Sequence, residues 1–586
     1  STPDAGCAAP TRVTWQYVDG AGQRHDLADP TAPPADTATV DSPAGQVPFV
    51  IRTETGTRDR AVYTITGLDP APDPSGATVD PSAWNDRLVY RFGGGCGASF
   101  TQGFTLLDPP ATDLLAKGYV MATATFNTFQ VLCNDVISAE TVSMVKERVI
   151  EAYGRRPVHT IGEGGSGGAI QQLLIAQDYP GLLDGIAPTV PFPDALSVSG
   201  GVFDCALLTN YYATPAGSAL SPDQRAAING HATADTCRLW DATFATGIDP
   251  AKGCRTDFSS FGAPGDLPFP TIPADEIYDP ATNPDGWRCT VWESNVAVTG
   301  RDPDTGFARP GYDNEGVQYG LDALGAGTIT ADQFLDLNGA VGGFDDDGQP
   351  MPRRSVVDPD LPRRAYGTGR VTGPWGGVPD TPIILVNVYT DPLGDIHDRV
   401  RSFSILDRLA GDDGSWPATV SLWSIGLPPG ASLIDTLTGA LGDFAIEPTL
   451  ALDEWLTAAE ARRADDGGGW RRALAATKPD AAQSRCQPAG QPEIVGADAN
   501  DDPACVAAFP IHEEPRMAAG APRSGDILKC ALQPVADALD DYPVELSAAQ
   551  ADRLAATFPT GVCDYTEPSQ GFVAFDRPWY DFGGDG

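Results

Sequence analysis

The sequence predicts an α/β fold, with a mostly parallel sheet covered by helices, because strand-like and helix-like segments alternate along it. Short apolar runs typical of buried strands lie at residues 88–92, 118–127 and 158–163. Apolar residues recur at helical spacing over residues 138–154 and 168–180. Ser138 and Gly154 are of the residue types that begin and end a helix.

The alternation stops after residue 190 and resumes near residue 381. Residues 381–391 and 418–426 are again strand-like, and residues 398–409 and 451–463 have helical spacing. The intervening segment is rich in Pro, Gly, Asp and aromatic residues, which indicates a large insertion into one core.

Changes in composition divide the 586 residues into five predicted parts, more than one ordinary domain would need. These are an N-terminal β-rich portion (1–80), the first half of the core (81–190), a cap or lid insertion (191–375), the second half of the core (376–465) and a disulfide-tied C-terminal extension (466–586).

Ser166 lies at the junction of a predicted strand and a predicted helix, inside the pattern Gly164-x-Ser166-x-Gly168. This is the setting of a nucleophile elbow, in which the neighbours must be small and the serine hydroxyl stands out of the sheet. The N-terminus of the following helix then supports the negative charge that develops during attack. The sequence therefore predicts that Ser166 is a nucleophile, with a plain structural turn as the other interpretation.

A glycine-rich stretch, RFGGGCG at residues 91–97, follows an earlier predicted strand. Such a loop lets backbone N–H groups turn toward a bound carbonyl group. We predict Gly94 or Gly95 as one oxyanion donor and the N–H of Gly167 as the other. A bond between Cys96 and Cys133 would tie this loop down, although the pairing of cysteines does not follow from sequence alone.

The run GGSGGAIQQLLIAQDYPGLLDGIAPTVP, residues 164–191, resembles the tannase and feruloyl-esterase branch of the α/β-hydrolases. YDNEGVQYGLDAL, GDIHDRVRSF and PRMAAGAP…DILKC point further to an uncharacterised family of secreted bacterial α/β-hydrolases. The resemblance covers roughly half of the chain, and implies the α/β-hydrolase fold and ester hydrolysis without naming a substrate. One feature departs from the tannase pattern, because Gly165 replaces the cysteine that usually precedes the elbow serine and is bridged to a cysteine beside the catalytic histidine.

A serine nucleophile needs a base, and the base needs an orienting acid, in the usual chain order Ser, Asp, His. Asp391 ends an apolar predicted strand and is our predicted acid, with Asp395 as the alternative. The segment after the next strand, where the base normally belongs, contains no histidine.

Only five histidines are available, at positions 25, 159, 231, 397 and 512. His159 lies in the strand below the elbow, where a satisfied core group is the expected role. Two histidines follow the acid, and we predict His397 as the base because its loop opens on the same sheet edge as the elbow. His512, in the C-terminal extension, is the alternative, and a site without a histidine base is the third interpretation.

The chain carries 38 Lys and Arg against 79 Asp and Glu, a formal net charge of −41. Such a charge repels nucleic acids and anionic membranes, and no apolar run is long enough to span a membrane. Eleven cysteines without a C-x-x-C pair or a histidine cluster argue against zinc and for about five disulfides and one free thiol in a secreted protein. The start at STPDAGC, without Met, fits the same interpretation.

No cofactor is predicted, apart from calcium as a weaker hypothesis for the cap. Its Asp-Gly runs at 302–306, 312–316 and 344–350 suit oxygen coordination, although none matches an EF-hand loop and surface turns explain them equally well.

Three functions remain open from the sequence. The first is a secreted serine hydrolase that cleaves small-molecule or polymeric carboxylic esters, with a shaped pocket under the cap. The second is a degenerate hydrolase fold that only binds a ligand or partner, and the third is an amidase or acyltransferase on the same site.

Overall fold

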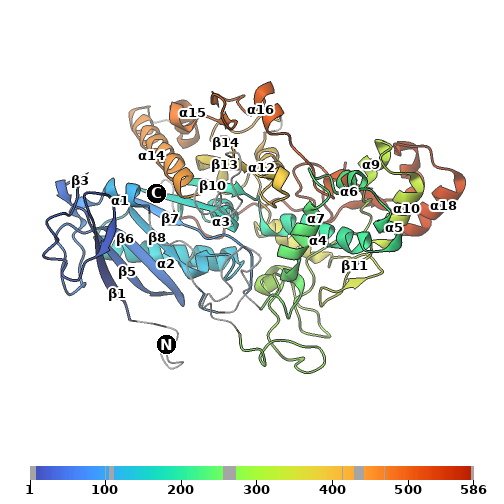
Figure 1. The fold of residues 1–586 in the computed structure, drawn as a ribbon, viewed down its shortest axis with the longest axis horizontal. Coiled ribbons are helices and arrows are strands. Elements are labelled where there is room, and N and C mark those ends of the chain that lie inside the picture. Colours follow the sequence, from blue (N-terminus) through green and yellow to red (C-terminus); the bar gives the residue numbers. More distant parts are fainter. Residues whose placement is uncertain are drawn as a thin grey trace.

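The protein is described here from a computed structural model, which describes residues 8, 10–98, 101–103, 111–254, 272–411, 414–427, 441–466 and 469–582. Within these residues, twelve strands form one sheet in the order β16-β15-β14-β13-β10-β9-β7-β8-β6-β5-β1-β2 (Figure 1). The strands are β1 Arg12–Val18, β2 Arg24–Asp26, β5 Val50–Arg58, β6 Ala61–Leu68, β7 Arg87–Arg91, β8 Val120–Ala124, β9 His159–Ser166, β10 Gly185–Pro191, β13 Ile383–Tyr389, β14 Val420–Gly426, β15 Arg485–Gln487 and β16 Ile494–Val495.

The central strands from β8 to β15 are parallel, and β6, β5, β1 and β2 at one edge and β16 at the other join them antiparallel. From β7 the chain moves to β8 on one side and then to β9 on the other side of β7. Such a point, where the strand order reverses, leaves a crevice beyond the carboxyl ends of the strands, where ligands bind in open α/β sheets. The mostly parallel α/β fold predicted from the sequence is confirmed.

Helices cover both faces of the sheet, because consecutive strand residues point to opposite faces. Along β13, Ile383 and Leu385 pack with the helices of one face, and Ile384 and Val386 with those of the other. The first face is covered by α2 Asp135–Tyr153, α3 Gly167–Asp178 and α12 Val400–Leu409, and the second by α1 Thr112–Ala116, α14 Leu441–Asp466 and α15 Trp470–Thr477 (Figure 1).

Helix α2 begins earlier than the sequence predicts. Asn134 is its N-cap and accepts a hydrogen bond from the Ile137 N–H at 3.1 Å, whereas Ser138 lies within the helix and donates to Gln171 Oε1 at 2.7 Å. Both are cap-type residues, so the pattern alone did not separate them. Gly154 ends the helix at φ +72°, as predicted.

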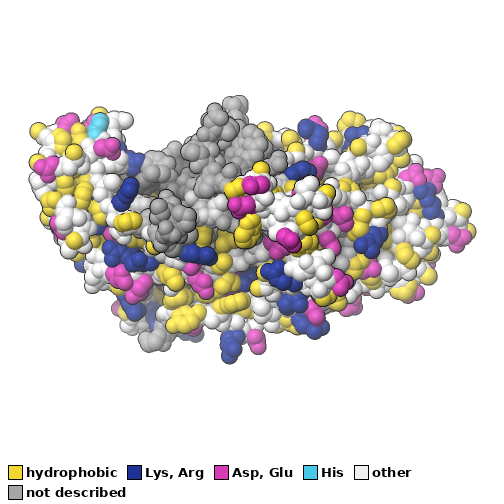
Figure 2. Space-filling view, turned by 90° about the horizontal axis from the view of Figure 1, so that it is seen from below, with side chains coloured by type: hydrophobic (Ala, Val, Ile, Leu, Met, Phe, Trp, Pro, Cys, Tyr) yellow, Lys and Arg dark blue, Asp and Glu magenta, His cyan; other side chains and the backbone are white. Residues whose placement is uncertain are grey.

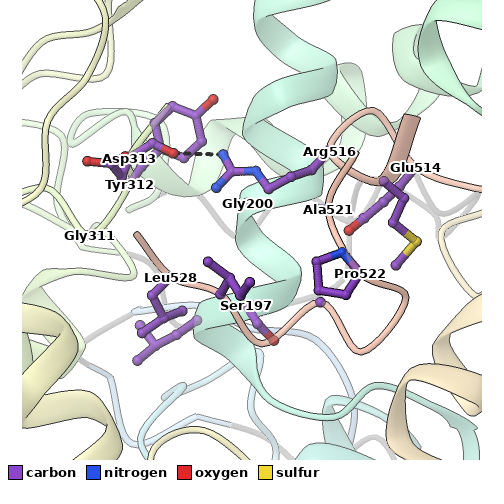
Figure 3. Close-up of a pocket in the computed structure, with 14 residues that line it drawn as sticks. Ser197, Gly200, Gly311, Tyr312, Asp313, Glu514, Arg516, Ala521, Pro522 and Leu528 are labelled. Atoms are coloured by element: carbon purple, nitrogen blue, oxygen red, sulfur yellow. Dashed lines mark hydrogen bonds between the residues drawn. The ribbon is translucent and has the colours of Figure 1, made fainter. Parts of the chain in front are cut away.

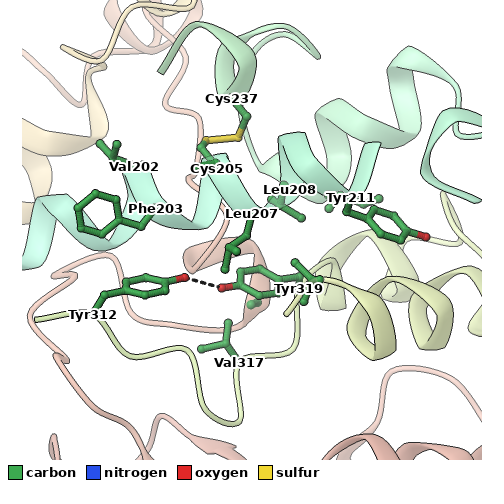
Figure 4. Packing of buried hydrophobic residues seen from close by; sticks show 14 of the residues in the cluster. Val202, Phe203, Cys205, Leu207, Leu208, Tyr211, Cys237, Tyr312, Val317 and Tyr319 are labelled. Atoms are coloured by element: carbon green, nitrogen blue, oxygen red, sulfur yellow. Dashed lines mark hydrogen bonds between the residues drawn. A yellow bond between two sulfur atoms is a disulfide. The ribbon is translucent and has the colours of Figure 1, made fainter. Parts of the chain in front are cut away.

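Between β10 and β13 the described chain adds no strand to the large sheet, and we call this insertion, residues 192–382, the cap. Its elements are α4 Ala195–Tyr212, α5 Pro215–Ser218, α6 Pro222–Asn229, α7 Thr236–Phe244, α8 Val296–Thr299, α9 Leu321–Gly325, α10 Ala331–Ala340, α11 Asp360–Gly367 and the hairpin β11 Gly343–Phe344 with β12 Pro350–Met351. Phe203 on α4 packs edge-on against Tyr312, and the Cys205–Cys237 disulfide joins α4 to α7 (Figure 4).

The C-terminal part of the chain packs partly on the core sheet and partly on the cap. Its first strands, β15 and β16, extend the core sheet beyond β14. The later elements, α16 Pro503–Ala508, β17 Ala531–Gln533, α17 Val535–Ala538, α18 Ala548–Thr557 and β18 Val562–Asp564, follow. Leu554 and Val562 belong to the same buried cluster as Phe203 of the cap, and α18 lies beside α10 (Figure 1).

A buried polar network joins the C-terminal segment, through Arg516, to the cap. The Asp204 carboxylate on α4 accepts hydrogen bonds from Tyr312 at 2.5 Å and Tyr319 at 2.6 Å, and from Arg516 through two nitrogens at 3.0 Å. Arg516 also donates to the Asp313 carbonyl at 2.7 Å, and Figure 3 shows its side chain reaching across α4 toward that residue. A buried carboxylate satisfied in this way is costly to unpair.

On the face shown in Figure 2, acidic and basic side chains are intermixed over the described surface. On that face the acidic side chains are thus spread among basic ones rather than gathered in one block.

Candidate active site

Ser166 stands at the junction of β9 and α3 in a backbone conformation that side chains rarely adopt, with φ +60° and ψ −123°. A non-glycine residue held at such angles costs on the order of 1–3 kcal/mol and is found mainly at functional sites. This is the strand–turn–helix geometry predicted for a nucleophile elbow, and it lifts Ser166 beyond the carboxyl end of the strand.

The elbow glycines permit a close approach of the backbone after β7. A Cβ added at Gly164 would lie 2.2 Å from the Phe92 carbonyl oxygen, and one added at Gly167 would lie 2.0 Å from the carbonyl oxygen of Gly95. Any side chain at these positions would therefore push the glycine-rich loop away from Ser166.

The glycine-rich loop is fixed from its far side. The Phe129 and Gln130 N–H groups donate to the Gly93 and Gly94 carbonyls at 3.2 and 2.9 Å. In a trans peptide the N–H points opposite to the C=O, so the Gly95 N–H faces away from that segment, toward the elbow. Among the described residues, no hydrogen bond uses this N–H or that of Gly94.

Two further features support the predicted oxyanion donors. Gly167 is the first residue of α3, so its N–H has no acceptor within the helix. The Cys96–Cys133 disulfide closes the base of the loop, which is the pairing that the sequence left open. The predicted donors Gly94, Gly95 and Gly167 thus lie together around Ser166.

His397 follows β13 and is buried, with a side chain held by Asp395. Its Nδ1 lies 2.6 Å from Asp395 Oδ1, which also accepts the His397 backbone N–H at 3.1 Å. Its Nε2 is buried and has no hydrogen-bond partner. A histidine fixed through Nδ1 by a carboxylate, with Nε2 free, has the arrangement of a general base.

Asp391, the acid predicted from the sequence, makes no described contact with His397, whereas the alternative, Asp395, does. Asp391 begins a short 3₁₀ turn, Asp391–Leu393, and its Oδ1 accepts the backbone N–H of Arg399 at 2.8 Å, while Oδ2 is buried without a partner. The turn directs this carboxylate toward the returning chain, and the alternative, Asp395, occupies the place beside His397.

The two carboxylates also differ in charge state. Burial opposes ionisation of Asp395, but the charge of His397 and its hydrogen bonds outweigh burial and hold the Asp395 pKa below its ordinary value. Burial raises the pKa of Asp391 to about 7, although the Arg399 N–H favours the ionised form. At neutral pH, Asp395 is therefore the ionised partner of His397.

Ser166 and His397 come from strands separated only by β10. Pro191 of β10 is paired with Ser166, and the next residue, Phe192, packs its ring 5.2 Å from the His397 ring. Ile396 lines the same cavity as Ser166. No described hydrogen bond joins the serine hydroxyl to the histidine.

A cavity of about 180 Å³ opens at Ser166 between the core and the cap. On the core side it is bounded by the loop from Gly95 to Ala98, Gln130 and the elbow; on the cap side it is bounded by α4, the segment from Thr243 to Gly253 and residues near Trp292. Gln130 and the α4 residues are site residues that sequence reasoning missed. The Gln130 side chain packs directly against Gly95, since a Cβ added at this glycine would lie 2.4 Å from Gln130 Oε1.

His159 lies in the core between two carboxylates, with Nδ1 2.7 Å from Asp453 Oδ1 and Nε2 3.3 Å from Glu460 Oε2. His512 belongs to the segment against the cap, where the neighbouring Glu513 N–H donates to the Gly230 carbonyl at 2.9 Å. Neither His512 nor His397 lines the described cavity itself, although Ile396, next to His397, does.

Metal ligands are sparse in the described part of the chain. The single group of three close candidate ligands is Cys205, His231 and Cys237, and both sulfurs are joined in a disulfide. Among the aspartates considered for calcium, Asp302 accepts the N–H groups of Asp304 and Thr305 in its own turn, both at 2.9 Å, and Asp313 pairs with Lys529 at 2.7 Å.

The strand order and the strained serine at the strand–helix turn are those of the α/β-hydrolase fold. The resemblance noted from the sequence is borne out by the family match. The chain belongs to the tannase-like family of unknown function (DUF6351), whose profile matches residues 1–574.

Solved structures that resemble the chain include esterase E22, at 10% identity over 74% of this chain and 99% of that one, with a TM-score of 0.25. Feruloyl esterase B from Aspergillus oryzae is 13% identical over 72% of this chain and 71% of its own, with a TM-score of 0.23. No curated protein sequence matches the chain.

Five disulfides join the ten described cysteines, at Cys96–Cys133, Cys205–Cys237, Cys254–Cys289, Cys486–Cys505 and Cys530–Cys563. Cys7, the eleventh, lies outside the described residues. So many disulfides indicate an oxidising environment. None of the helices in the described ranges is both long and apolar enough to cross a membrane.

Proposed function

We propose that the protein is a secreted serine hydrolase that cleaves carboxylic esters through an acyl-enzyme on Ser166. One observation carries the proposal: the strained serine at the end of β9 shares its sheet edge with a buried histidine that is fixed by Asp395 and has a free Nε2. The tannase-like family supports ester hydrolysis, and the five disulfides support an extracellular location.

In the first half of the reaction, Ser166 Oγ attacks the ester carbonyl carbon while His397 Nε2 takes its proton. The C–O bond to the alcohol then breaks, and the alcohol leaves with that proton. A water molecule then attacks the acyl carbon and gives its proton to Nε2; the bond to Ser166 Oγ breaks, Nε2 returns the proton to Oγ, and the acid leaves. Asp395 stabilises the transient imidazolium and holds the tautomer that leaves Nε2 as the acceptor.

The negative charge on the carbonyl oxygen is held by backbone N–H groups, those of Gly167 and of Gly94 or Gly95. Because the loop carbonyls are already bonded to residues 129 and 130, these donors are oriented before substrate binds. Such preorganisation is usually the largest single contribution to catalysis. The chemistry requires no metal, and the substrate is a small-molecule or polymeric ester.

A protein that only binds a ligand is the competing function, favoured by the absence of a described hydrogen bond between Ser166 and His397. An amidase or acyltransferase would use the same acyl-enzyme and differs only in the leaving group or acceptor.

Labelling with a fluorophosphonate, followed by mass spectrometry of the intact protein and of its peptides, distinguishes a working site from a degenerate one. We expect one label per chain, on Ser166, and none in Ser166→Ala. Ser199→Ala is the matched control, because Ser199 lines the same cavity but donates its hydroxyl to the Leu196 carbonyl at 2.7 Å. An unlabelled parent, or equal labelling of both variants, would contradict the proposal.

A further inference from the structure

Resting on the proposed ester hydrolysis, we infer that the cavity beside Ser166 accepts esters whose buried half is apolar and about the size of a benzene ring, and discriminates against a polyhydroxylated ring of that size.

The interior of the cavity is built from apolar side chains. Ile170 of α3 and Phe192 after β10 contribute from the core, and Val202 and Phe203 of α4 and Trp292 contribute from the cap. All five are buried, with 3–5% of their surface exposed. They pack with one another, since the rings of Phe203 and Trp292 meet edge-on with centroids 6.1 Å apart.

Three of the polar side chains that line the cavity, Asn295, Ser199 and Lys252, are engaged elsewhere. Asn295 donates to the Cys133 and Val291 carbonyls at 2.7 and 3.0 Å, and Ser199 donates to Leu196. Lys252 pairs with Asp249 at 2.9 Å and exposes 63% of its side chain, which places its charge at the mouth. On the core side, Gln130 is the described side chain with an amide not committed to a protein partner.

The volume limits what this interior holds. At about 180 Å³ it is close to an engineered apolar cavity of about 150 Å³ that binds benzene. A phenyl group or an acyl chain of about six to eight carbons fills it, an acetyl group leaves it mostly empty, and a long fatty chain exceeds it.

Most hydroxyl groups on the buried ring would lose their hydrogen bonds to water without gaining a protein partner. One hydroxyl can reach the Gln130 amide, but the others would face Phe203, Trp292 and Val202. A buried hydroxyl without a hydrogen bond is penalised strongly enough to override its added contacts. The more polar half of the ester belongs at the mouth, near Thr246 and Lys252.

The first test compares p-nitrophenyl acetate, hexanoate and dodecanoate, which share one leaving group. We expect kcat/KM for hexanoate to exceed that for each of the others at least tenfold. The second compares methyl benzoate with methyl 3,4,5-trihydroxybenzoate, and we expect at least a tenfold preference for benzoate. Equal rates in either comparison, or a preference for the trihydroxy ester, would overturn the inference.

A cavity-filling variant ties the preference to this space. Val202→Phe should lower the ratio of kcat/KM for hexanoate to that for acetate at least tenfold. Val506→Phe, the same change at a residue that exposes 48% of its surface, is the control and should leave this ratio unchanged. An equal loss for both esters in Val202→Phe would also overturn the inference.

These tests separate the inference from the proposed function. If no ester is hydrolysed and Ser166 is not labelled, the proposed function fails and the inference fails with it. If esters are hydrolysed in a Ser166-dependent manner without the expected selectivity, only the inference fails.

Discussion

The core sheet and the cap, with the C-terminal segment that packs on it, are stabilised in different ways. The core buries apolar side chains on both faces of its strands, as at Ile383 to Val386, and within the described residues it contains two disulfides, Cys96–Cys133 in its loops and Cys486–Cys505 at β15. The cap and its partner segment contain three disulfides and the buried network around Asp204.

We expect the core to carry out the chemistry and the cap to determine which substrate is accepted. Ser166, Asp395 and His397 all follow core strands, whereas the cap supplies α4 and Trp292 to the wall of the cavity. Changes in the core loops should therefore abolish turnover without unfolding the chain, and changes in the cap should act through stability or substrate choice.

The largest effect is expected at the elbow. Ser166→Ala removes the nucleophile and should lower kcat for p-nitrophenyl esters on the order of 10⁴-fold or more. The melting temperature should fall little, because the backbone strain remains and one buried contact changes. Retention of parental turnover by the purified variant would exclude Ser166 as the nucleophile.

His397→Ala should have the next largest effect. We expect kcat to fall on the order of 10³-fold or more, because the base acts as a unit with the nucleophile. His512→Ala is the comparison, and should retain activity within about threefold. The reverse outcome would mean that the C-terminal segment completes the active site, and the division between core and cap would break down. Steady-state kinetics on one ester decides between them.

Asp395→Asn should lower kcat on the order of 10²–10⁴-fold, since an amide favours the wrong tautomer of His397. Asp391→Asn, an identical change four residues away, should retain most activity because Asp391 contacts the Arg399 backbone instead. Profiles of kcat/KM against pH for both variants check this. A larger loss in Asp391→Asn would restore the acid first predicted from sequence.

A cap substitution should act on stability instead. Arg516→Leu leaves the buried Asp204 carboxylate without its cation and should cost about 3–5 kcal/mol of unfolding free energy. The double variant Asp204→Asn/Arg516→Leu keeps an acceptor for Tyr312 and should recover part of the loss. Arg553→Leu breaks an exposed pair with Asp336 and should cost no more than about 1 kcal/mol. Urea unfolding of the three variants tests the ranking, and equal losses in Arg516→Leu and Arg553→Leu would contradict it.

A further effect concerns how stability depends on pH. The folded-state pKa of Asp391, about 7, exceeds the ordinary value of 3.8, so the folded state holds a proton that the unfolded state has lost between pH 4 and 7. Burial of this carboxyl therefore weakens stability as the pH rises through that window. Asp391→Asn should gain stability over the parent from pH 5 to 8, by at most roughly 4 kcal/mol at about 1.4 kcal/mol per pH unit.

Asp395→Asn is the matched control for that measurement, and has the opposite sign. Its lowered folded pKa gives stability that is present above the unfolded pKa and lost as the pH falls through the folded value. A difference between Asp391→Asn and the parent that stays constant with pH would contradict the expectation.

Much of the core could be predicted because strand and helix periods are local properties of sequence. The runs that became β7, β9 and β13 are short and apolar, and the elbow serine sits where one of them meets a helix. His397 was reached by elimination among five histidines rather than from a pattern.

The choice between Asp391 and Asp395 could not be made in this way, because a 3₁₀ turn decides where each side chain points. The wall of the cavity was also out of reach, since Gln130 and Val202 approach Ser166 only through tertiary packing. The segment after β14, where a base would normally lie, falls at 428–440, outside the described residues.

The pairing of Asp204 with Arg516 spans 312 residues and so has a consequence for biosynthesis. At roughly 5–20 residues per second, the ribosome adds Arg516 about 15–60 s after Asp204. Throughout that interval α4 lacks Leu554 and Val562, which complete its buried cluster, and the nascent chain carries a half-built apolar surface. The lobe that shapes the substrate cavity is therefore the last to mature, and its yield depends on how well the unfinished chain is kept from aggregation.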